Sequence, residues 1–537
     1  MGDYLQDHAI SRRGLIKTGA AGALALAGAE WLGAPGFWSS TASAATGEAA
    51  AVGKPIRGGT LTAAFLSGGQ AETISPALAY APADIARVQN LHDSLFMIAP
   101  NGYGNHPGLA LSAESNADAS IWTFHLRDGV TWHDGKPFTA DDVVYTIRSW
   151  LGKRSFLESL AAVILDSNGI RKRDRHTVEV TLTRGVAEFP TITALYNAYV
   201  IQDGASLNST VGTGPFKYKS FTPGQRSVFI ANRDYWRTGE PYVDTLVIDS
   251  SYTDDSARVN AALSGSADDV TAMPYALAKA YAASGSLRVG NAASSSFQNI
   301  VCRVDQAPFT DVRVIQALKL LIDRPTIIES AFDGYGSTSN DCPEKGLPYF
   351  ASDIPVLAHD IEKAKSLLKA AGHEKLTLTL QTSQSVVDGM YGAATLFAEQ
   401  ASPGGVTIKL QSIPGSTFFT PASNYLNRTF TQDFWILYPS LTALYLDKLF
   451  SKAPVNESHW GSSGYDTLLF DAVGETDHAK AEQKWHAVQQ EIHTNDGDII
   501  YANMNYVDGY APRVKGLETT SAGVADNFNF ASAWLSR

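Results

Sequence analysis

This chain of 537 residues has few cysteines and no net positive charge. Its 2 cysteines, Cys302 and Cys342, are too few and too far apart for a disulfide-rich scaffold or a C-x-x-C motif. Lys and Arg number 42 against 54 Asp and Glu, so the formal net charge is −12. An acidic surface repels phosphate groups, and the sequence therefore predicts no nucleic-acid partner.

Long apolar runs are missing as well. A helix that spans a bilayer needs about 20 apolar residues, and the weakly apolar run Thr18–Ala29 ends at Glu30. The pair Arg12-Arg13 precedes this run, and the small-residue sequence A-S-A follows it at 42–44. This order is typical of a twin-arginine export signal that is cleaved after Ala44.

The signal leads to expectations about location. We expect residues 1–44 to be removed, with the twin-arginine translocase as a partner during export. No cysteine lies near the predicted cleavage site, so lipid attachment there is excluded. The sequence therefore predicts a soluble periplasmic protein that is not lipid-anchored.

Enzyme and cofactor motifs are absent too. The sequence has no H-E-x-x-H, no G-x-S-x-G, no Walker loop and no G-x-G-x-x-G. Ser366 and Lys369 fit S-x-x-K, but the amphipathic helix around them explains both residues. His133-Asp134 has no second histidine at metal-ligand spacing. We therefore expect no catalytic residues, no metal and no cofactor.

Strand and helix patterns alternate along the first half of the chain. Gly58–Leu66 is predicted to be a strand, and Ile121–Trp132 alternates apolar and polar residues with a turn signal at Asp128-Gly129. Phe138–Leu151 then has helical spacing, with Thr139 as a good N-cap and Asp142 at a capping position. Turn and cap chemistry therefore account for the cluster of His133-Asp134 and Asp141-Asp142.

The second half shows a β-α-β order. Asp360–Gly372 is predicted to be a helix, with Asp360 able to cap its start. The strand Leu376–Thr382, a helix near Met390–Gln400 and the strand Val406–Ile413 follow. This alternation indicates an α/β domain.

Four segments together resemble one family, the extracytoplasmic solute-binding proteins of family 5 that serve peptide, oligopeptide and nickel ABC importers. They are "WTFHLRDGVTWHDGKPFTADDVVYTI", "GTGPFKYKSF" with "NRDYWRTGEPYVDTLVI", "APFTDVRVIQALKLLIDR" and "HDIEKAKSLLKAAG". They occur in family order and span nearly all of the predicted mature chain. The resemblance implies a binding protein and not an enzyme.

The resemblance implies a bilobed α/β fold of the periplasmic-binding-protein type 2 class, in its large three-part form. Its lobes would be joined by two crossing strands, at Ser295–Val304 and Gly497–Val507. The core of lobe one would combine residues 58–85, 212–291 and 505–537. Residues 86–211 would form its outer subdomain, and residues 292–504 would form lobe two.

The ligand-binding residues are expected where the lobes face each other. In family peptide binders an Asp in a G-W-x-x-D stretch holds the α-amino group of the ligand. Here "QDFWILYPSLTALYLD" has no Gly-Trp, and Thr442 falls near the place of that Asp. The departure argues against a peptide ligand that is held by a free α-amino group. The candidate ligand-binding residues are Gln70, Ser75, Thr382, Ser383, Gln384, Asp433, Trp435 and Tyr438; for Trp435 and Tyr438, packing in the lobe-two core is the alternative.

The cysteines leave two possibilities. In an oxidising compartment Cys302 and Cys342 can form one disulfide that closes a loop of about forty residues. Two buried thiols are the alternative, and the disulfide is the expectation that we carry forward.

The expected function is capture of a small-molecule solute between two lobes and its delivery to an ABC permease and ATPase complex at the membrane. A short peptide or amino-acid-derived compound is the first expectation for that solute. An opine, a sugar conjugate or a metal chelate is the alternative, and a periplasmic enzyme is the rival class. We expect the protein to act as a monomer.

Overall fold

The computed structural model describes residues 54–79, 81–104, 106–152, 155, 157–419 and 422–536. The predicted export signal, residues 1–44, lies outside this part of the chain. Within it, no helix combines the length and the apolar content that crossing a membrane requires.

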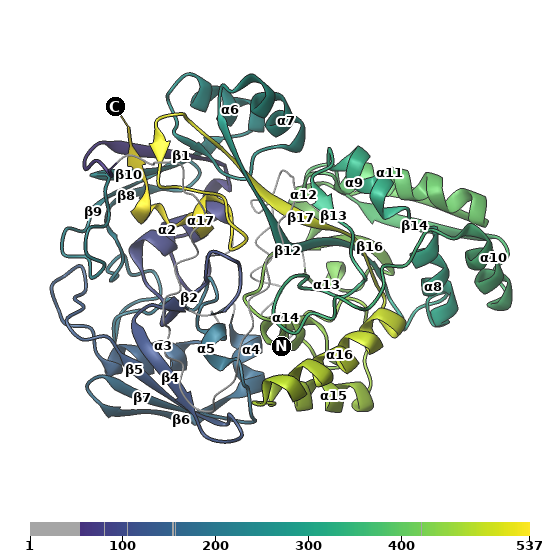
Figure 1. Cartoon of the computed structure of the whole chain (residues 1–537), viewed down its shortest axis with the longest axis horizontal. Helices are drawn as coiled ribbons and strands as arrows, with labels where there is room; N and C mark the ends of the chain where they lie inside the picture. Colours follow the sequence, from purple (N-terminus) through teal and green to yellow (C-terminus); the bar gives the residue numbers. More distant parts are fainter. Residues whose placement is uncertain are drawn as a thin grey trace.

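The protein has two lobes, as Figure 1 shows. One mixed sheet of 11 strands extends through both of them. The strand order is β15-β14-β16-β12-β17-β11-β1-β10-β9-β8, with β13 beside β17. The strands are β1 Thr60–Leu66, β8 Phe216–Thr222, β9 Arg226–Ala231, β10 Thr245–Tyr252, β11 Asp269–Val270, β12 Arg288–Cys302, β13 Gly336–Ser337, β14 Leu376–Thr382, β15 Val406–Ser412, β16 Phe430–Trp435 and β17 Asp498–Tyr510. The predicted bilobed α/β fold is confirmed.

The long strands β12 and β17 run from one lobe to the other and pair antiparallel along most of their length (Figure 1). They overlap the two predicted crossing strands, although β12 ends at Cys302, before the predicted end at Val304, and β17 begins at Asp498, one residue after the predicted start. The register of β12 shifts between Ala293 and Phe297, so a bulge interrupts the pair midway. Ala292 pairs with Tyr506, so the predicted boundaries at 291/292 and 504/505 lie almost opposite each other. Those boundaries remain predictions.

Lobe one contains the β1 end of the sheet and a separate outer subdomain. Its remaining elements are η2 Gly69–Ala71, α2 Pro82–Leu91, β2 Phe96–Met97, β3 His106–Pro107, β4 Ala110–Ser115, β5 Ile121–Leu126, α3 Ala140–Ser149, α4 Glu158–Ile164, β6 Leu165–Asp174, β7 Thr177–Leu182, α5 Phe189–Ile192, α6 Asp255–Leu263, α7 Tyr275–Ser284, β18 Val514–Lys515, α17 Ala525–Phe528, η4 Phe530–Ser532 and β19 Trp534–Leu535. The outer subdomain is built on the sheet β4-β5-β7-β6.

The predicted turn and helix start in the outer subdomain are confirmed. The Thr139 side chain accepts a hydrogen bond from the first turn of α3, and the Asp142 side chain accepts one from the Thr139 backbone, which completes a capping box. The N–H of Gly135 bonds the carbonyl of Trp132 at 2.8 Å and closes the turn. The His133 ring bonds the backbone of Gly212 and Gly214. These hydrogen bonds fix the start of α3 and tie the His133 turn to the segment at Gly212 and Gly214.

Lobe two contains the β15 end of the sheet and most of the longer helices. Its helices are α8 Val312–Leu321, α9 Arg324–Ala331, α10 Ile361–Ala370, α11 Met390–Ala401, η3 Ser402–Gly404, α12 Gly415–Phe418, α13 Ala422–Tyr425, α14 Leu441–Lys448, α15 Ser463–Val473 and α16 His478–Asn495. Strands β14 and β15 pair in parallel with α11 between them in sequence, so the predicted β-α-β order is confirmed.

The predicted disulfide is wrong in this structure, because both cysteines are free and buried. Cys302 ends β12 and packs in the main core of lobe two. Cys342 belongs to a separate small cluster with Ala351 and Ile354, and its thiol donates to the carbonyl of Gln489 at 3.4 Å. The alternative of two buried thiols is the one the structure contains.

Candidate functional site between the lobes

A cavity of about 60 Å³ lies where the two lobes meet. Lobe one contributes α2 and the C-terminal segment 522–528, and lobe two contributes the residues directly after β16. The crossing strand β17 adds Tyr506. Elements far apart in the sequence therefore converge on one point at the hinge, which is where a bilobed protein encloses a solute.

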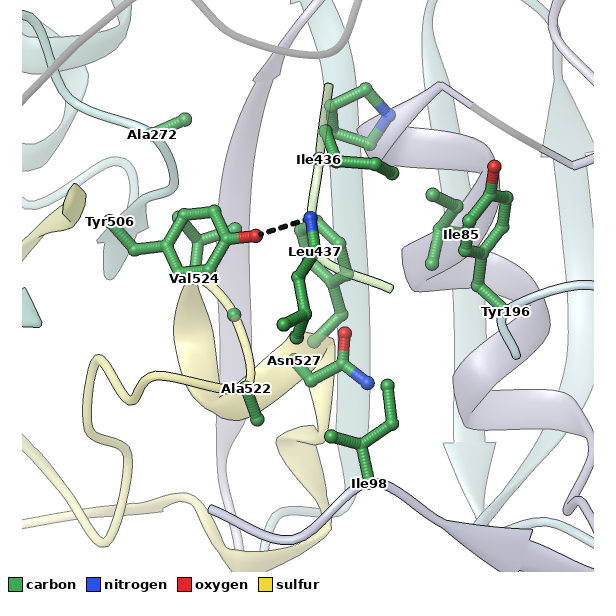
Figure 2. A pocket seen from close by; sticks show the side chains of 13 residues that line it. Ile85, Ile98, Tyr196, Ala272, Ile436, Leu437, Tyr506, Ala522, Val524 and Asn527 are labelled. Carbon is green, nitrogen blue, oxygen red and sulfur yellow. Dashed lines mark hydrogen bonds between the residues drawn. The ribbon is translucent and has the colours of Figure 1, made fainter. Parts of the chain in front are cut away.

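The cavity wall is mainly apolar. Six aliphatic and aromatic side chains supply most of it: Ile85, Ile98, Ile436, Leu437, Val524 and Phe528. Figure 2 shows several of them around a common space, with Ile85 and Tyr196 on one side and Tyr506 on the other. The site can therefore hold an apolar group away from water.

Three lining residues offer polar atoms: Tyr196, Tyr506 and Asn527. The Tyr506 hydroxyl accepts from the N–H of Leu437 at 3.4 Å and bonds the Ser296 hydroxyl at 2.6 Å. Burial raises the pKa of Tyr506 to about 12, so this phenol stays neutral at physiological pH. Tyr506 thereby ties the crossing strands to the cavity wall of lobe two.

The turn that carries Asn527 has an unusual backbone. Four consecutive residues, Ala525 to Phe528, have positive φ between 48° and 61°, so α17 is a left-handed turn. Each non-glycine residue in this region costs roughly 1–2 kcal/mol. Three hydrogen bonds hold the turn: from the N–H of Ala525 to Asp508, from the N–H of Asp526 to the Glu518 carbonyl, and from the Asn90 amide to the Phe528 carbonyl. Strain of this kind gathers at functional sites.

Two predicted pocket residues, Trp435 at the end of β16 and Tyr438 three residues later, do not line this cavity. Trp435 is buried and donates to Glu457, and Tyr438 donates from its hydroxyl to Asp447 at 2.9 Å. Trp435 belongs to the core and partly buried Tyr438 packs against it, as in the alternative given for them. Ile436 and Leu437, which lie between them, reach the cavity instead. Ile436 and Leu437 are consecutive and both line the cavity, so the chain no longer alternates sides as a strand does once β16 has ended at Trp435.

The other candidates also lie away from this cavity. Ser75 is buried and donates to the Leu207 carbonyl at 2.7 Å, while Gln70 is exposed. Thr382 is buried and donates to Gln432, while Ser383 is buried beside Ser385. Gln384 is exposed, and buried Asp433 accepts from Tyr425. Binding roles for these residues remain predictions.

A second contact between the lobes lies beside α14. Thr442, in the first turn of α14, donates from Oγ1 to Oε2 of Glu188 at 2.6 Å. The N–H of Ala187 bonds the carbonyl of Val473 at 2.8 Å, and the Arg184 guanidinium lies 3.8 Å from the centre of the Phe470 ring. The lobes are therefore also in contact outside the cavity.

Burial raises the pKa of Glu188 above its ordinary value of 4.5, although hydrogen bonds from Thr442 and Ser440 oppose the rise. The sequence flagged Thr442 only as standing near the place of a family aspartate. Its partner Glu188 carried no signal, because the contact spans 254 residues.

No group of three or more His, Cys, Asp or Glu side chains in the described part of the chain is arranged to hold a metal ion. The site as built can enclose an apolar group and bond it through a few neutral polar atoms. It offers no charge for acid-base chemistry at the cavity wall itself.

Residues 105–456 match the family of bacterial extracellular solute-binding proteins, family 5, in its middle region. The chain belongs to this family. It is 26% identical to the dipeptide-binding protein of Escherichia coli K12 over 452 residues, covering 76% of this chain and 83% of the relative.

Solved structures agree on the fold. AgaA of A. tumefaciens R10, determined with agropinic acid, superposes with a TM-score of 0.76 at 22% identity, covering 89% of this chain and 99% of that one. NikZ of Campylobacter jejuni, determined with Ni(L-His), gives 0.76 at 19% identity, covering 88% and 99%. The two proteins were determined with chemically different ligands, so the shared fold does not identify the solute.

Proposed function

We propose that this chain is the solute-binding subunit of an ABC importer. It captures a small solute between its lobes and presents the closed form to a permease and ATPase complex in the membrane. The observation that carries the proposal is the apolar cavity at the hinge, built jointly by α2, the segment after β16, β17 and the C-terminal turn. Membership of the family supports it.

The mechanism is closure of two lobes about β12 and β17. The bulge in β12 between Ala293 and Phe297 lies in this connection and offers a place for bending. A solute that contacts both walls of the cavity stabilises the closed state over the open one. The contact of Thr442 with Glu188 forms only when the lobes meet, so it reports closure directly.

The first candidate for the solute is a short peptide or an amino-acid-derived compound. The E. coli relative is a dipeptide-binding protein, which supports this choice. AgaA was determined with agropinic acid and NikZ with Ni(L-His), so an opine and a metal chelate are the alternative solutes. Thr442 is engaged by Glu188, which argues against an α-amino group being anchored there.

The proposal includes location and assembly. The twin-arginine pattern supports export to the periplasm, and the proposed protein has no lipid anchor and no catalytic activity. We expect it to act as a monomer and to meet the twin-arginine translocase only during export.

Native mass spectrometry of protein taken from its own periplasm tests the proposal. The expected result is a folded monomer with one bound small molecule, recovered chemically unchanged after incubation. Small-angle scattering should then show that the stripped protein compacts when this molecule is returned. The proposal would be contradicted if the protein carries no small molecule and if no fraction of the periplasmic extract makes it more compact.

A further inference from the structure

The chemistry of the interlobe cavity points to a class of solute. This inference rests on the proposed function, since it concerns the molecule that the lobes enclose. None of the side chains that line the cavity is charged at neutral pH: the wall consists of aliphatic and aromatic residues, two tyrosines, a glycine and Asn527. An ammonium or carboxylate group buried here would face no opposite charge, and such burial is strongly unfavourable.

Two carboxylates that neighbour lining residues, Asp84 and Glu344, are directed elsewhere. Asp84 lies on α2 between lining residues Pro82 and Ile85, but it is paired with Arg87 at 2.8 Å and accepts from the N–H of Thr73. Glu344 accepts a hydrogen bond from the hydroxyl of Ser295 on one oxygen and one from the N–H of Tyr438 on the other. Neither group is left to hold a cationic solute.

Asn527 is the polar side chain that the fold leaves for recognition. Among the residues that the structure describes, no group hydrogen-bonds its carboxamide, although the residue is partly buried. Figure 2 shows this carboxamide between Leu437 of lobe two and Ile98 of lobe one. A carboxamide both donates and accepts, so it can bond a neutral carbonyl, amide or hydroxyl.

Hydrogen bonds with buried residues fix the backbone around Asn527 in an unusual conformation. Ala525, Asp526, Asn527 and Phe528 are all left-handed, a conformation that non-glycine residues adopt rarely and as single residues. Asp508 and Asn90, both fully or almost fully buried, fix the two ends of the turn by hydrogen bonds to its backbone. Buried groups therefore hold the strained turn, and Asn527 within it lies in the cavity wall.

We propose that the cavity receives an uncharged, apolar group of the solute, and that Asn527 determines specificity by bonding a neutral carbonyl or amide next to that group. The solute class is an N-blocked, amidated or similarly neutralised amino-acid or peptide derivative, not a zwitterionic peptide. This agrees with the absence of an anchoring aspartate at Thr442.

Titration calorimetry with two matched probes tests the proposal. N-acetyl-Leu-Leu-amide is neutral, whereas Leu-Leu is its zwitterionic counterpart. Mature protein stripped of bound molecules should bind the neutral probe at least about tenfold more tightly. Equal or tighter binding of Leu-Leu would overturn the proposal.

Two variants separate recognition from folding. N527G removes the carboxamide, and glycine adopts positive φ without strain, so this variant should bind the neutral probe about tenfold more weakly without a lower melting temperature. N527D keeps the shape, adds a carboxylate that can meet an ammonium, and should shift the preference toward Leu-Leu. N168D, at an exposed asparagine of the outer subdomain, is the control and should change neither affinity. An N527D preference equal to that of the wild type would contradict the assigned role.

The outcomes distinguish this inference from the proposed function. Binding of neither probe overturns the assigned solute class. The proposed function then stands if a co-purified small molecule still compacts the stripped protein, and it falls as well if none does.

Discussion

Thr442 and Glu188 join the two lobes by a hydrogen bond of 2.6 Å, from the threonine hydroxyl to a glutamate oxygen. Thr442 lies in the first turn of α14 in lobe two, and Glu188 directly precedes α5 in lobe one. Both groups have water as a partner when the lobes separate. The bond therefore contributes to the free-energy difference between the open and closed states, which is one term in the solute affinity.

Replacing Thr442 by valine tests that contribution. T442V keeps the shape of the side chain but leaves the Glu188 oxygen without its hydroxyl donor, at a cost of about 1–3 kcal/mol in the closed state. Small-angle scattering at saturating co-purified solute should show a smaller closed fraction, and the affinity should fall roughly tenfold. T467V removes an exposed threonine hydroxyl of α15 and is the matched control. Equal affinities of T442V and T467V would contradict the assigned role.

The acidity of Glu188 predicts how closure depends on pH. Its pKa is raised by burial in the closed state, whereas separation of the lobes returns it toward the ordinary value of 4.5. The closed state thus binds the proton more tightly, so this group favours closure fully below 4.5 and less as pH rises through the raised pKa. Radius of gyration measured against pH should show closure weakening over that window.

The variant E188Q isolates this group from the other titrating side chains. Glutamine still accepts from Thr442 but cannot ionise, so the pH dependence assigned to Glu188 should disappear while closure at low pH is retained. A pH profile of E188Q that superposes on that of the wild type would refute the assignment.

Local patterns in the sequence were enough to predict many elements. Leu376–Thr382 alternates with period two and forms β14 with those bounds, and the spacing after Asp360 identifies α10 together with its cap. The capping box of Thr139 and Asp142 likewise involves residues three apart. Each of these features depends on neighbours in the chain, so sequence alone contains the information.

The cavity could not be predicted in the same way. Whether Trp435 or the next two residues, Ile436 and Leu437, line the cavity depends on how the end of β16 packs against segments distant in the sequence. The left-handed turn at Asn527 is held by Asp508 and Asn90, the latter more than 400 residues away. Such features arise from tertiary contacts between residues far apart in the chain, so no short stretch of sequence can predict them.

A buried ion pair between Arg324 and Asp341 connects α9 to the loop before Cys342 in lobe two. Arg324 makes two hydrogen bonds, of 2.7 and 2.9 Å, to Asp341, and both side chains are at most 1% exposed. Asp341 also accepts from the N–H of Ile500 on β17 at 2.9 Å. D341A should lower the free energy of unfolding by about 3–5 kcal/mol, because it leaves a buried arginine unpaired.

Denaturant unfolding followed by tryptophan fluorescence measures this change. K172A breaks the exposed pair of Lys172 with Asp141 and should cost less than about 1 kcal/mol. Similar losses for D341A and K172A would show that the buried pair does not stabilise the native state.

The two cysteines provide a direct check on the core of lobe two. Burial raises the pKa of both thiols, so neither is reactive in the native protein. Protein that is exported, purified without reductant and then denatured should react with 2 equivalents of a thiol reagent, since both cysteines are free. Native protein should react much more slowly, at a rate set by opening of the core. Finding no reactive thiol after denaturation would mean that Cys302 and Cys342 are bridged, which would require their two separate hydrophobic clusters to rearrange.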